Sequence, residues 1–167
     1  MRLDDREERE RKPLPPCVIR EARPEDRGMI FGMFLKSAHS GFVYRSMAEP
    51  AFKNYGARLL ETLINRSQVI TVSKKGDADT LLGFAIAERP FKHLGHIVLH
   101  FIYIKYDYRQ QGLGSAMIKA LGHDGKNTTL FATHMNPAWF LIGPKFGAVY
   151  NPFLLWPEFH TNKEEAA

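Results

Sequence analysis

The sequence predicts one mixed domain of the α/β or α+β class, and three observations support that prediction. Runs rich in β-branched and aromatic residues alternate with stretches whose apolar residues recur at helical spacing. The chain has 167 residues, of which 44% are hydrophobic and 25% charged, which is typical of a globular protein. No internal repeat or low-complexity segment interrupts the alternation. A chain of this length buries about 70% of the surface that its unfolded form exposes, which is enough for one core.

Both ends of the chain have the composition of solvated tails. Residues 1–16 mix acids and bases and finish in a proline cluster that blocks helix continuation. The last residues, TNKEEAA, are equally polar. We therefore expect a flexible N-terminal tail at 1–16, a single domain at 17–157 and a C-terminal tail at 158–167. A role of the N-terminal tail in binding a protein partner stays open.

The first half of the domain predicts a strand, two helices and a hairpin. Pro24 followed by two acids is a helix start, and Ile30 and Phe34 lie on one face of the helix that follows. A second helix repeats this spacing with several leucines, and the turn KKGDADT joins two strands into a hairpin. The expected elements are a strand at 17–21, helices at 23–38 and 48–65, and strands at 67–74 and 81–89.

The second half predicts three more strands that alternate with two helices. A run of Ile, Val, Phe and Tyr is typical of a central strand, and Leu113 and Met117 lie on the apolar face of the helix that follows. Gly143 and Pro144 are expected to interrupt the last helix. The expected elements are a strand at 96–106, a helix at 113–122, a strand at 128–135, a short helix at 136–147 and a closing strand at 148–156.

Charge and cysteine content exclude several classes of protein. The net charge of +5 comes from scattered cations, which suits an anionic ligand but argues against nucleic-acid binding. Cys17 is the single cysteine, which excludes an intramolecular disulfide and a cysteine-based zinc site. The longest apolar-rich run, 97–104, is far below the ~20 residues of a membrane span. We expect a cytoplasmic protein with no membrane segment.

The segment YDYRQQGLGSAM, residues 106–117, places two glycines between a strand and a helix. Main-chain N–H groups at a helix start are unpaired and attract anions, and Gly112 and Gly114 remove side chains that would block a phosphate. Arg109 adds a cation beside the same opening. A dinucleotide fingerprint would need a glycine where Met117 stands, so that alternative is excluded. The segment therefore predicts a phosphate site.

Arg109 to Gly114, RQQGLG, resembles the signature of the GNAT superfamily of N-acetyltransferases, which is Arg or Gln, two residues, Gly, one residue, and Gly or Ala. The order of elements from Cys17 to Trp156 resembles that fold as well. The resemblance implies a mixed, mostly antiparallel sheet of about six to seven strands flanked by about four helices. It also implies a splayed pair of strands that holds CoA.

The resemblance further implies acetyl-CoA as co-substrate, with its diphosphate on the main chain of the glycine turn and its pantetheine along the preceding strand. A bulge near Tyr103 would splay this strand from the next one. Asn136 matches a family asparagine that contacts the cofactor, although an Asn before Pro is also an ordinary helix N-cap. The implied cofactor-binding residues are Ile102, Tyr103, Ile104, Arg109, Gln110, Gln111, Gly112, Leu113, Gly114, Ser115 and Asn136.

The catalytic groups are less clear from the sequence. The family's usual acid, a tyrosine, is replaced by Gly143, so Tyr150, Tyr103 or Tyr106 would have to substitute, or the thiolate leaves unaided. His100 is our candidate base, and His134 is the other histidine expected beside the reaction centre. Both histidines also suit a structural role. No metal is expected, because on a strand the histidines before His100 lie too far from it to share one ion.

We therefore expect an acetyl-CoA-dependent N-acetyltransferase that acts by direct attack of a primary amine, carried by a small molecule, a peptide N-terminus or a lysine. The alternative is a GNAT-fold binding protein that holds CoA but acts through a protein partner, which the loss of the tyrosine at Gly143 favours. Both a monomer and a homodimer are compatible with the sequence.

Overall fold

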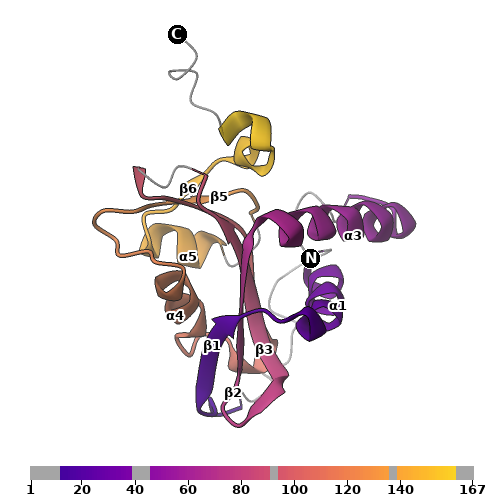
Figure 1. Cartoon of the computed structure of the whole chain (residues 1–167), viewed down its shortest axis with the longest axis vertical. Helices are drawn as coiled ribbons and strands as arrows, with labels where there is room; N and C mark the ends of the chain where they lie inside the picture. Colours follow the sequence, from indigo (N-terminus) through magenta and orange to yellow (C-terminus); the bar gives the residue numbers. More distant parts are fainter. Residues whose placement is uncertain (1–11, 39–45, 91–93, 136–138, 161–167) are drawn as a thin grey trace.

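A six-stranded sheet organises the protein, with its strands in the spatial order β1-β2-β3-β4-β5-β6 (Figure 1). The computed structural model describes residues 12–38, 46–90, 94–135 and 139–160. The strands are β1 (Cys17–Glu21), β2 (Gln68–Lys74), β3 (Asp77–Glu88), β4 (His96–Ile104), β5 (Thr129–Ala132) and β6 (Val149–Tyr150). The α-helices among these residues are α1 (Arg27–Ala38), α3 (Glu49–Arg66), α4 (Leu113–Ala120) and α5 (Trp139–Lys145).

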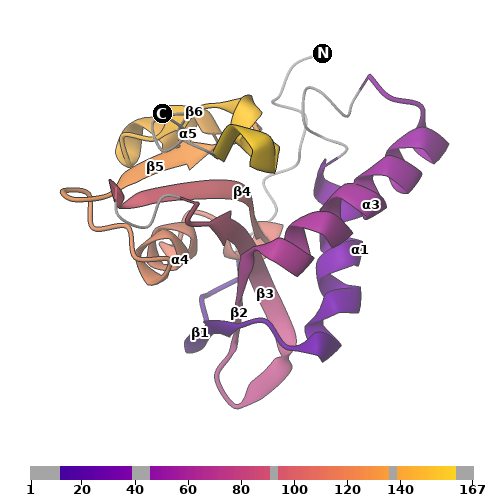
Figure 2. The same cartoon turned by 45° about the horizontal axis from the view of Figure 1, so that its top comes forward.

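The sheet separates two helical layers. Helices α1 and α3 cover one face, and α4 and α5 cover the other (Figures 1 and 2). Phe34, Leu60 and Phe84 belong to the core on the α1 and α3 side, whereas Met117 and Ile118 belong to the core on the α4 side. Each helix therefore buries one apolar stripe against the sheet, as its spacing predicts.

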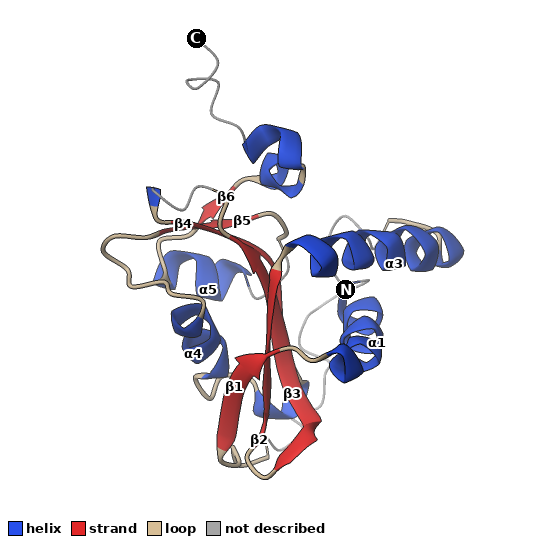
Figure 3. Ribbon diagram, viewed as in Figure 1, coloured by secondary structure: helices blue, strands red, loops and turns tan. Residues whose placement is uncertain are grey.

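The strand orientations are mixed. Strands β1 to β4 pair antiparallel through successive neighbours, whereas β4 pairs with β5 and β5 with β6 in parallel (Figure 3). The predicted fold class is confirmed, with a six-stranded mixed sheet and helices on both faces. Within the described ranges, no helix has both the length and the apolar character needed to cross a bilayer.

The end of the domain differs from the prediction in two ways. Helix α5 was expected to be interrupted at Gly143 and Pro144, but it continues through both residues to Lys145. A seven-residue helix loses only one internal hydrogen bond to a proline at this position, so the helix tolerates Pro144. The expected closing strand at 148–156 was also wrong in length, because β6 is two residues long and a 3-10 helix at Pro152–Leu155 follows it.

Residues on either side of the expected domain boundaries also make contacts. Lys12 forms an ion pair of 3.1 Å with Asp107, which lies close to the glycine turn. At the other end, Pro157–His160 forms a 3-10 helix, and His160 Nε2 donates to the Leu154 carbonyl at 2.7 Å. Lys12 and His160, which fall within the predicted tails, therefore contact the domain.

Candidate functional site

Strands β4 and β5 separate halfway along β4. Only His96–Leu99 of β4 pair in parallel with Thr129–Ala132 of β5, whereas β4 stays paired with β3 as far as Ile104. Lys105 N–H donates to the Leu82 carbonyl on the β3 side at 2.8 Å. Main-chain groups alternate along a strand, so those of Ile102 and Ile104 point to the side that β5 has left. The splayed strand pair that the resemblance implies is therefore present at this edge.

A β-bulge lies at His100. The resemblance implied a bulge near Tyr103, three residues later in β4. Ile86 pairs with Phe101 while its neighbour Ala87 pairs with Leu99, so His100 is the extra residue of β4. Tyr103 pairs regularly with Phe84 of β3. The bulge sits where the His100 ring reaches Glu88 at the end of β3.

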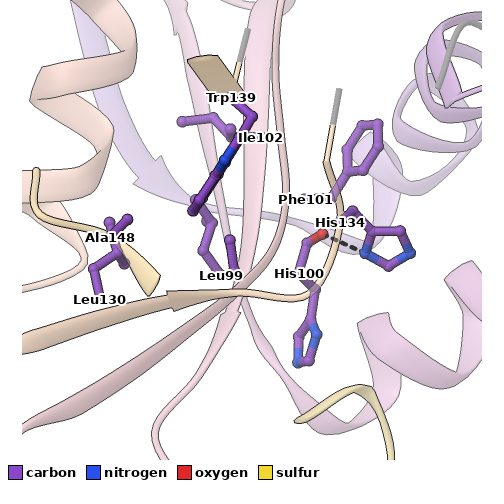
Figure 4. Close-up of a pocket in the computed structure, with 9 residues that line it drawn as sticks. Leu99, His100, Phe101, Ile102, Leu130, His134, Trp139 and Ala148 are labelled. Atoms are coloured by element: carbon purple, nitrogen blue, oxygen red, sulfur yellow. Dashed lines mark hydrogen bonds between the residues drawn. The ribbon is translucent and has the colours of Figure 1, made fainter. Parts of the chain in front are cut away.

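A pocket opens where the two strands part (Figure 4). Leu99 and Ile102 of β4 line it together with Trp139 of α5, whose indole points into the space between them (Figure 4). His134 lines the same pocket from the segment after β5. The remaining lining residues are His100, Phe101, Leu130, Ala132 and Ala148. The pocket is mostly apolar and has two histidines, His100 and His134, among its lining residues.

The glycine turn connects β4 with α4. Gln110 has φ of 61° and Gly112 has φ of 86°, both in the left-handed region, and Gly112 is the N-cap of α4. Glycine adopts this conformation without a steric penalty, whereas Gln110 has to be held in it. No main-chain N–H from Gln110 to Ser115 donates a hydrogen bond to another described residue. The turn therefore presents a row of donors.

The two glycines leave space over these donors. A Cβ at Gly112 would meet no heavy atom within 4 Å, and a Cβ at Gly114 would only touch the Ile102 Cδ1 atom at 3.9 Å. Packing inside the protein therefore does not require the second glycine. A concave turn with unpaired N–H groups and no side chains over it fits a diphosphate.

Three cationic or polar side chains surround the turn. Arg109 Nε donates to the Ile104 carbonyl at 2.9 Å, and its guanidinium lies 5.6 Å from the ring centroids of Tyr103 and Tyr106. Lys145 Nζ donates to Ser115 Oγ at 3.0 Å in the first turn of α4. The sequence analysis missed Lys145 as a candidate, because only the packing of α5 beside α4 brings this cation to the turn.

The other predicted cofactor residues are placed as follows. Gln111 Nε2 donates to the Lys12 carbonyl at 2.9 Å, and the Leu113 side chain is buried in the core, so Leu113 offers only its main chain to a ligand. Asn136 lies outside the described residues. Among the described residues, no three His, Cys, Asp or Glu side chains are grouped so that they could hold a metal ion.

Glu88 is the centre of a buried polar cluster behind the pocket. Its Oε1 atom accepts from Arg66 Nε at 2.6 Å, from Ser67 Oγ at 3.1 Å and from His100 Nε2 at 2.9 Å. Burial alone would raise the pKa of Glu88, but His100 and Arg66 outweigh it and lower that pKa to about 2. Glu88 is therefore a carboxylate at neutral pH.

The cluster continues from His100 to His134. His100 is 1% exposed, and its Nδ1 atom lies 3.1 Å from Thr133 Oγ1. His134 Nδ1 lies 3.0 Å from the same hydroxyl and 2.9 Å from the His100 carbonyl oxygen (Figure 4). Burial lowers the pKa of both imidazoles. The nearby His100 lowers the pKa of His134 further, to about 4. Both rings are therefore neutral at pH 7.

These histidines make the stability of the protein depend on pH. Each binds a proton less readily when folded, so its contribution is complete above pH 6.5 and is lost as the pH falls toward the lower folded-state pKa. For His134, a shift from 6.5 to about 4 corresponds to about 3 kcal/mol. Urea unfolding should give a lower free energy at about pH 4.5 than at about pH 7. The drop should be smaller in His134→Asn, and an equal drop in that variant would contradict the assignment.

The Trp139 indole lies against Gly143, the position where the resemblance implies a tyrosine. The two residues are one helical turn apart in α5, and a Cβ at Gly143 would lie 3.0 Å from Trp139 Cε2 and 3.1 Å from Cζ2. The indole therefore covers the surface where a side chain at 143 would begin.

Gly143→Tyr should accordingly destabilise the protein. The new side chain overlaps the indole, and overpacking of this kind costs about 1–3 kcal/mol. The free energy of unfolding should recover when Trp139→Ala is added, because the overlap is gone. Gly28→Tyr is the control, since a Cβ at that helical glycine meets nothing within 4 Å. Additive effects of the changes at 143 and 139 would argue against this overlap.

The tyrosines proposed as substitute acids lie in different surroundings. Tyr150 of β6 is 39% exposed and packs edge-on against Trp139, with ring centroids 6.2 Å apart. Tyr103 packs with Phe84 on the other face of the sheet, at a centroid distance of 6.1 Å. Tyr150 thus contacts Trp139, a residue of the pocket wall.

Comparisons with known proteins agree with this fold. The model of the Acetyltransferase (GNAT) family matches residues 43–138, more than half of the chain. A search of curated proteins found no match. Among solved structures, the chain resembles a protein from Pyrococcus furiosus described as an acetyl transferase (TM-score 0.57, 17% identity, covering 77% of this chain and 91% of that one).

Two further solved structures resemble the chain at similar levels. One is a ribosomal-protein-alanine N-acetyltransferase from Brucella melitensis biovar Abortus 2308 (TM-score 0.54, 17% identity, covering 78% of this chain and 89% of that one). The other is an N-acetyltransferase from Staphylococcus aureus Mu50 (TM-score 0.50, 20% identity, covering 78% and 82%). At these identities the likeness shows the fold.

Proposed function

Because the chain belongs to the acetyltransferase (GNAT) family, we propose that it transfers the acetyl group of acetyl-CoA to a primary amine. The acceptor is a small amine, a peptide N-terminus or a lysine side chain. One observation carries the proposal. The strand whose outer edge is left open at Ile102 and Ile104 leads directly into a turn of unpaired N–H groups.

Each part of this edge has a task in the proposal. Bound acetyl-CoA supplies the acetyl group as a reactive thioester. The main-chain N–H groups of Gln110–Ser115 bind the diphosphate, and Arg109 and Lys145 add positive charge beside it. The main-chain groups of Ile102 pair with the amides of the pantetheine arm, because the Ile104 carbonyl already accepts from Arg109. The Ile104 N–H donates to the carbonyl oxygen on which negative charge develops during attack by the amine.

A binding protein on the same fold is the second candidate function. Gly143 stands where the family has its acid, and the chain exposes large apolar side chains that would suit a protein partner. Those near the C-terminal end are Val149, Tyr150, Phe153, Trp156 and Phe159. We place either protein in the cytoplasm, where the free thiol of Cys17 stays reduced.

Calorimetry with CoA and an acetyl-transfer assay on an amine panel separate the two functions. The enzyme should bind CoA and acetylate at least one member of a panel of polyamines, peptide N-termini and lysine peptides. A protein that binds CoA tightly but acetylates none of them is the binding protein. Absence of CoA binding would reject both readings of the site.

A further inference from the structure

Part of the pocket between β4 and β5 is built from side chains of the protein core. Leu99, Leu130 and Ala132 line it, and each is at most 6% exposed. Leu99 and Leu130 also belong to the core on the α4 side of the sheet. Close-packed side chains of a core yield little to a ligand. This part of the pocket therefore has a fixed shape.

The Trp139 indole narrows the pocket and is itself held by its neighbours. It points into the space beside Leu99 and Ile102 (Figure 4). On α5 it lies against Gly143, where a Cβ would be 3.0 Å from the indole Cε2 atom. The Tyr150 ring packs edge-on against it at a centroid distance of 6.2 Å. A ring held between two neighbours presents a fixed apolar surface to the pocket.

The space that remains in the pocket is small. The cavity volume is about 30 Å³. Since roughly 10–15 Å³ of such volume holds one water molecule, the cavity has room for about two groups of methyl size. Its lining is mostly apolar, so burial of hydrocarbon is favoured there. The pocket therefore fits the end of a short hydrocarbon chain.

Ile102 connects this pocket with the glycine turn. Its side chain lines the pocket, and its Cδ1 atom would lie 3.9 Å from a Cβ at Gly114. In the proposed function, CoA starts at the turn with its diphosphate and continues along Ile102 with its pantetheine arm. The acyl group at the end of that arm therefore reaches the pocket.

Resting on the proposed function, we infer that the pocket receives the acyl group of the cofactor and that Trp139 is the residue that limits its length. The substrates are then CoA thioesters whose acyl group has two or three carbons. Beyond the carbonyl carbon, an acetyl group adds one methyl-sized group and a propionyl group adds two, which is what the cavity holds. A longer chain meets the indole of Trp139.

The position of the acyl group can be tested without any transfer assay. The chain has two tryptophans, so Trp156→Phe leaves Trp139 as the single fluorescent indole. CoA and acetyl-CoA share the adenine and the diphosphate, so a difference between them in Trp139 emission reports the acyl group. We expect emission at shorter wavelength with acetyl-CoA, because a methyl group beside the indole makes its surroundings less polar. Equal emission at saturation with both would overturn the inference.

Calorimetry with acetyl-, propionyl-, butyryl- and hexanoyl-CoA tests the length limit. Wild type should bind the first two within about fourfold of each other and butyryl-CoA about tenfold or more weakly, because its chain overlaps the indole. Trp139→Ala opens the pocket, so its affinity should instead rise about fourfold for each added CH₂ up to butyryl-CoA. Trp139→Phe keeps a smaller ring and should accept butyryl-CoA but not hexanoyl-CoA.

Two further variants accompany this series. Ala148 lines the pocket and is half-buried, so Ala148→Leu should fill the cavity and weaken acetyl-CoA about tenfold relative to CoA. Phe140→Ala is the matched control, because Phe140 follows Trp139 in α5 but is 70% exposed and is not among the residues that line the pocket. Its order of affinities for the four thioesters should equal that of wild type.

The outcomes separate this inference from the proposed function. If wild type acetylates an amine but binds hexanoyl-CoA as tightly as acetyl-CoA, the inference fails alone. It also fails if folded Trp139→Ala and Trp139→Phe both keep the wild-type order of affinities. If wild type binds the thioesters in the expected order but transfers no acyl group, the assignment of the pocket stands and the proposed transfer fails. If no thioester binds, both fail.

Discussion

Gly112→Glu is expected to lower the affinity for CoA about 1,000-fold, or ~4 kcal/mol, while the protein still folds. A side chain at this position meets no heavy atom within 4 Å, so its carboxylate stands in open space beside the N–H groups of the glycine turn. It competes with the diphosphate for these donors and repels it. Two lost charge-assisted hydrogen bonds of roughly 1.5–3 kcal/mol each account for the loss. Calorimetric titration with CoA measures it.

Gly125→Glu is the control for this prediction. Gly125 has φ of 71°, and a Cβ there, as at Gly112, would meet no heavy atom within 4 Å, but Gly125 lies in the loop between α4 and β5. Both substitutions force a side chain into the left-handed region, which costs roughly 1–2 kcal/mol of stability. The control should therefore lose similar stability and keep its affinity for CoA. Equal affinities of the two variants would show that the diphosphate does not bind at the turn.

Glu88→Ala should lower the free energy of unfolding by about 3–5 kcal/mol. The substitution removes the acceptor of three hydrogen bonds and leaves the largely buried Arg66 guanidinium and the buried His100 Nε2 proton without it. Unpaired buried donors carry the full cost of their lost hydration. Urea unfolding at neutral pH gives the difference between variant and wild type.

Glu61→Ala provides the comparison with an exposed ion pair. Glu61 accepts from Arg27 at 3.0 Å, and its side chain is 59% exposed. Such pairs contribute at most about 1 kcal/mol, so this variant should unfold close to wild type. A loss of stability in Glu88→Ala no larger than in Glu61→Ala would mean that the polar cluster does not hold β3, β4 and α3 together.

The parts of the molecule that depend on local sequence could be predicted. The apolar face of α4 is an example, since its spacing predicted Leu113 and Met117 on that face and both are buried. The glycine turn could be recognised for the same reason, because helix start and left-handed conformation are properties of neighbouring residues. The family resemblance then supplied the splay of β4 from β5.

The parts that depend on packing could not be predicted. His100 reaches Glu88 because a bulge shifts the register of β3 against β4, and no pattern of neighbouring residues in the sequence predicts that shift. The same holds for Lys145, which reaches Ser115 across two helices that are 18 residues apart in the sequence. Gly143 appeared as a helix breaker, whereas its structural meaning is the space that it gives to the Trp139 indole. These three features depend on contacts between residues, which the helix and strand propensities of the sequence do not predict.

The contact of Lys12 with the glycine turn links the amino-terminal end of the domain to the proposed cofactor. The Lys12 carbonyl accepts from Gln111, and its ammonium group pairs with Asp107, so both sides of the turn are tied to the chain that enters β1. A ligand bound at the turn would therefore lie beside the residues that precede β1.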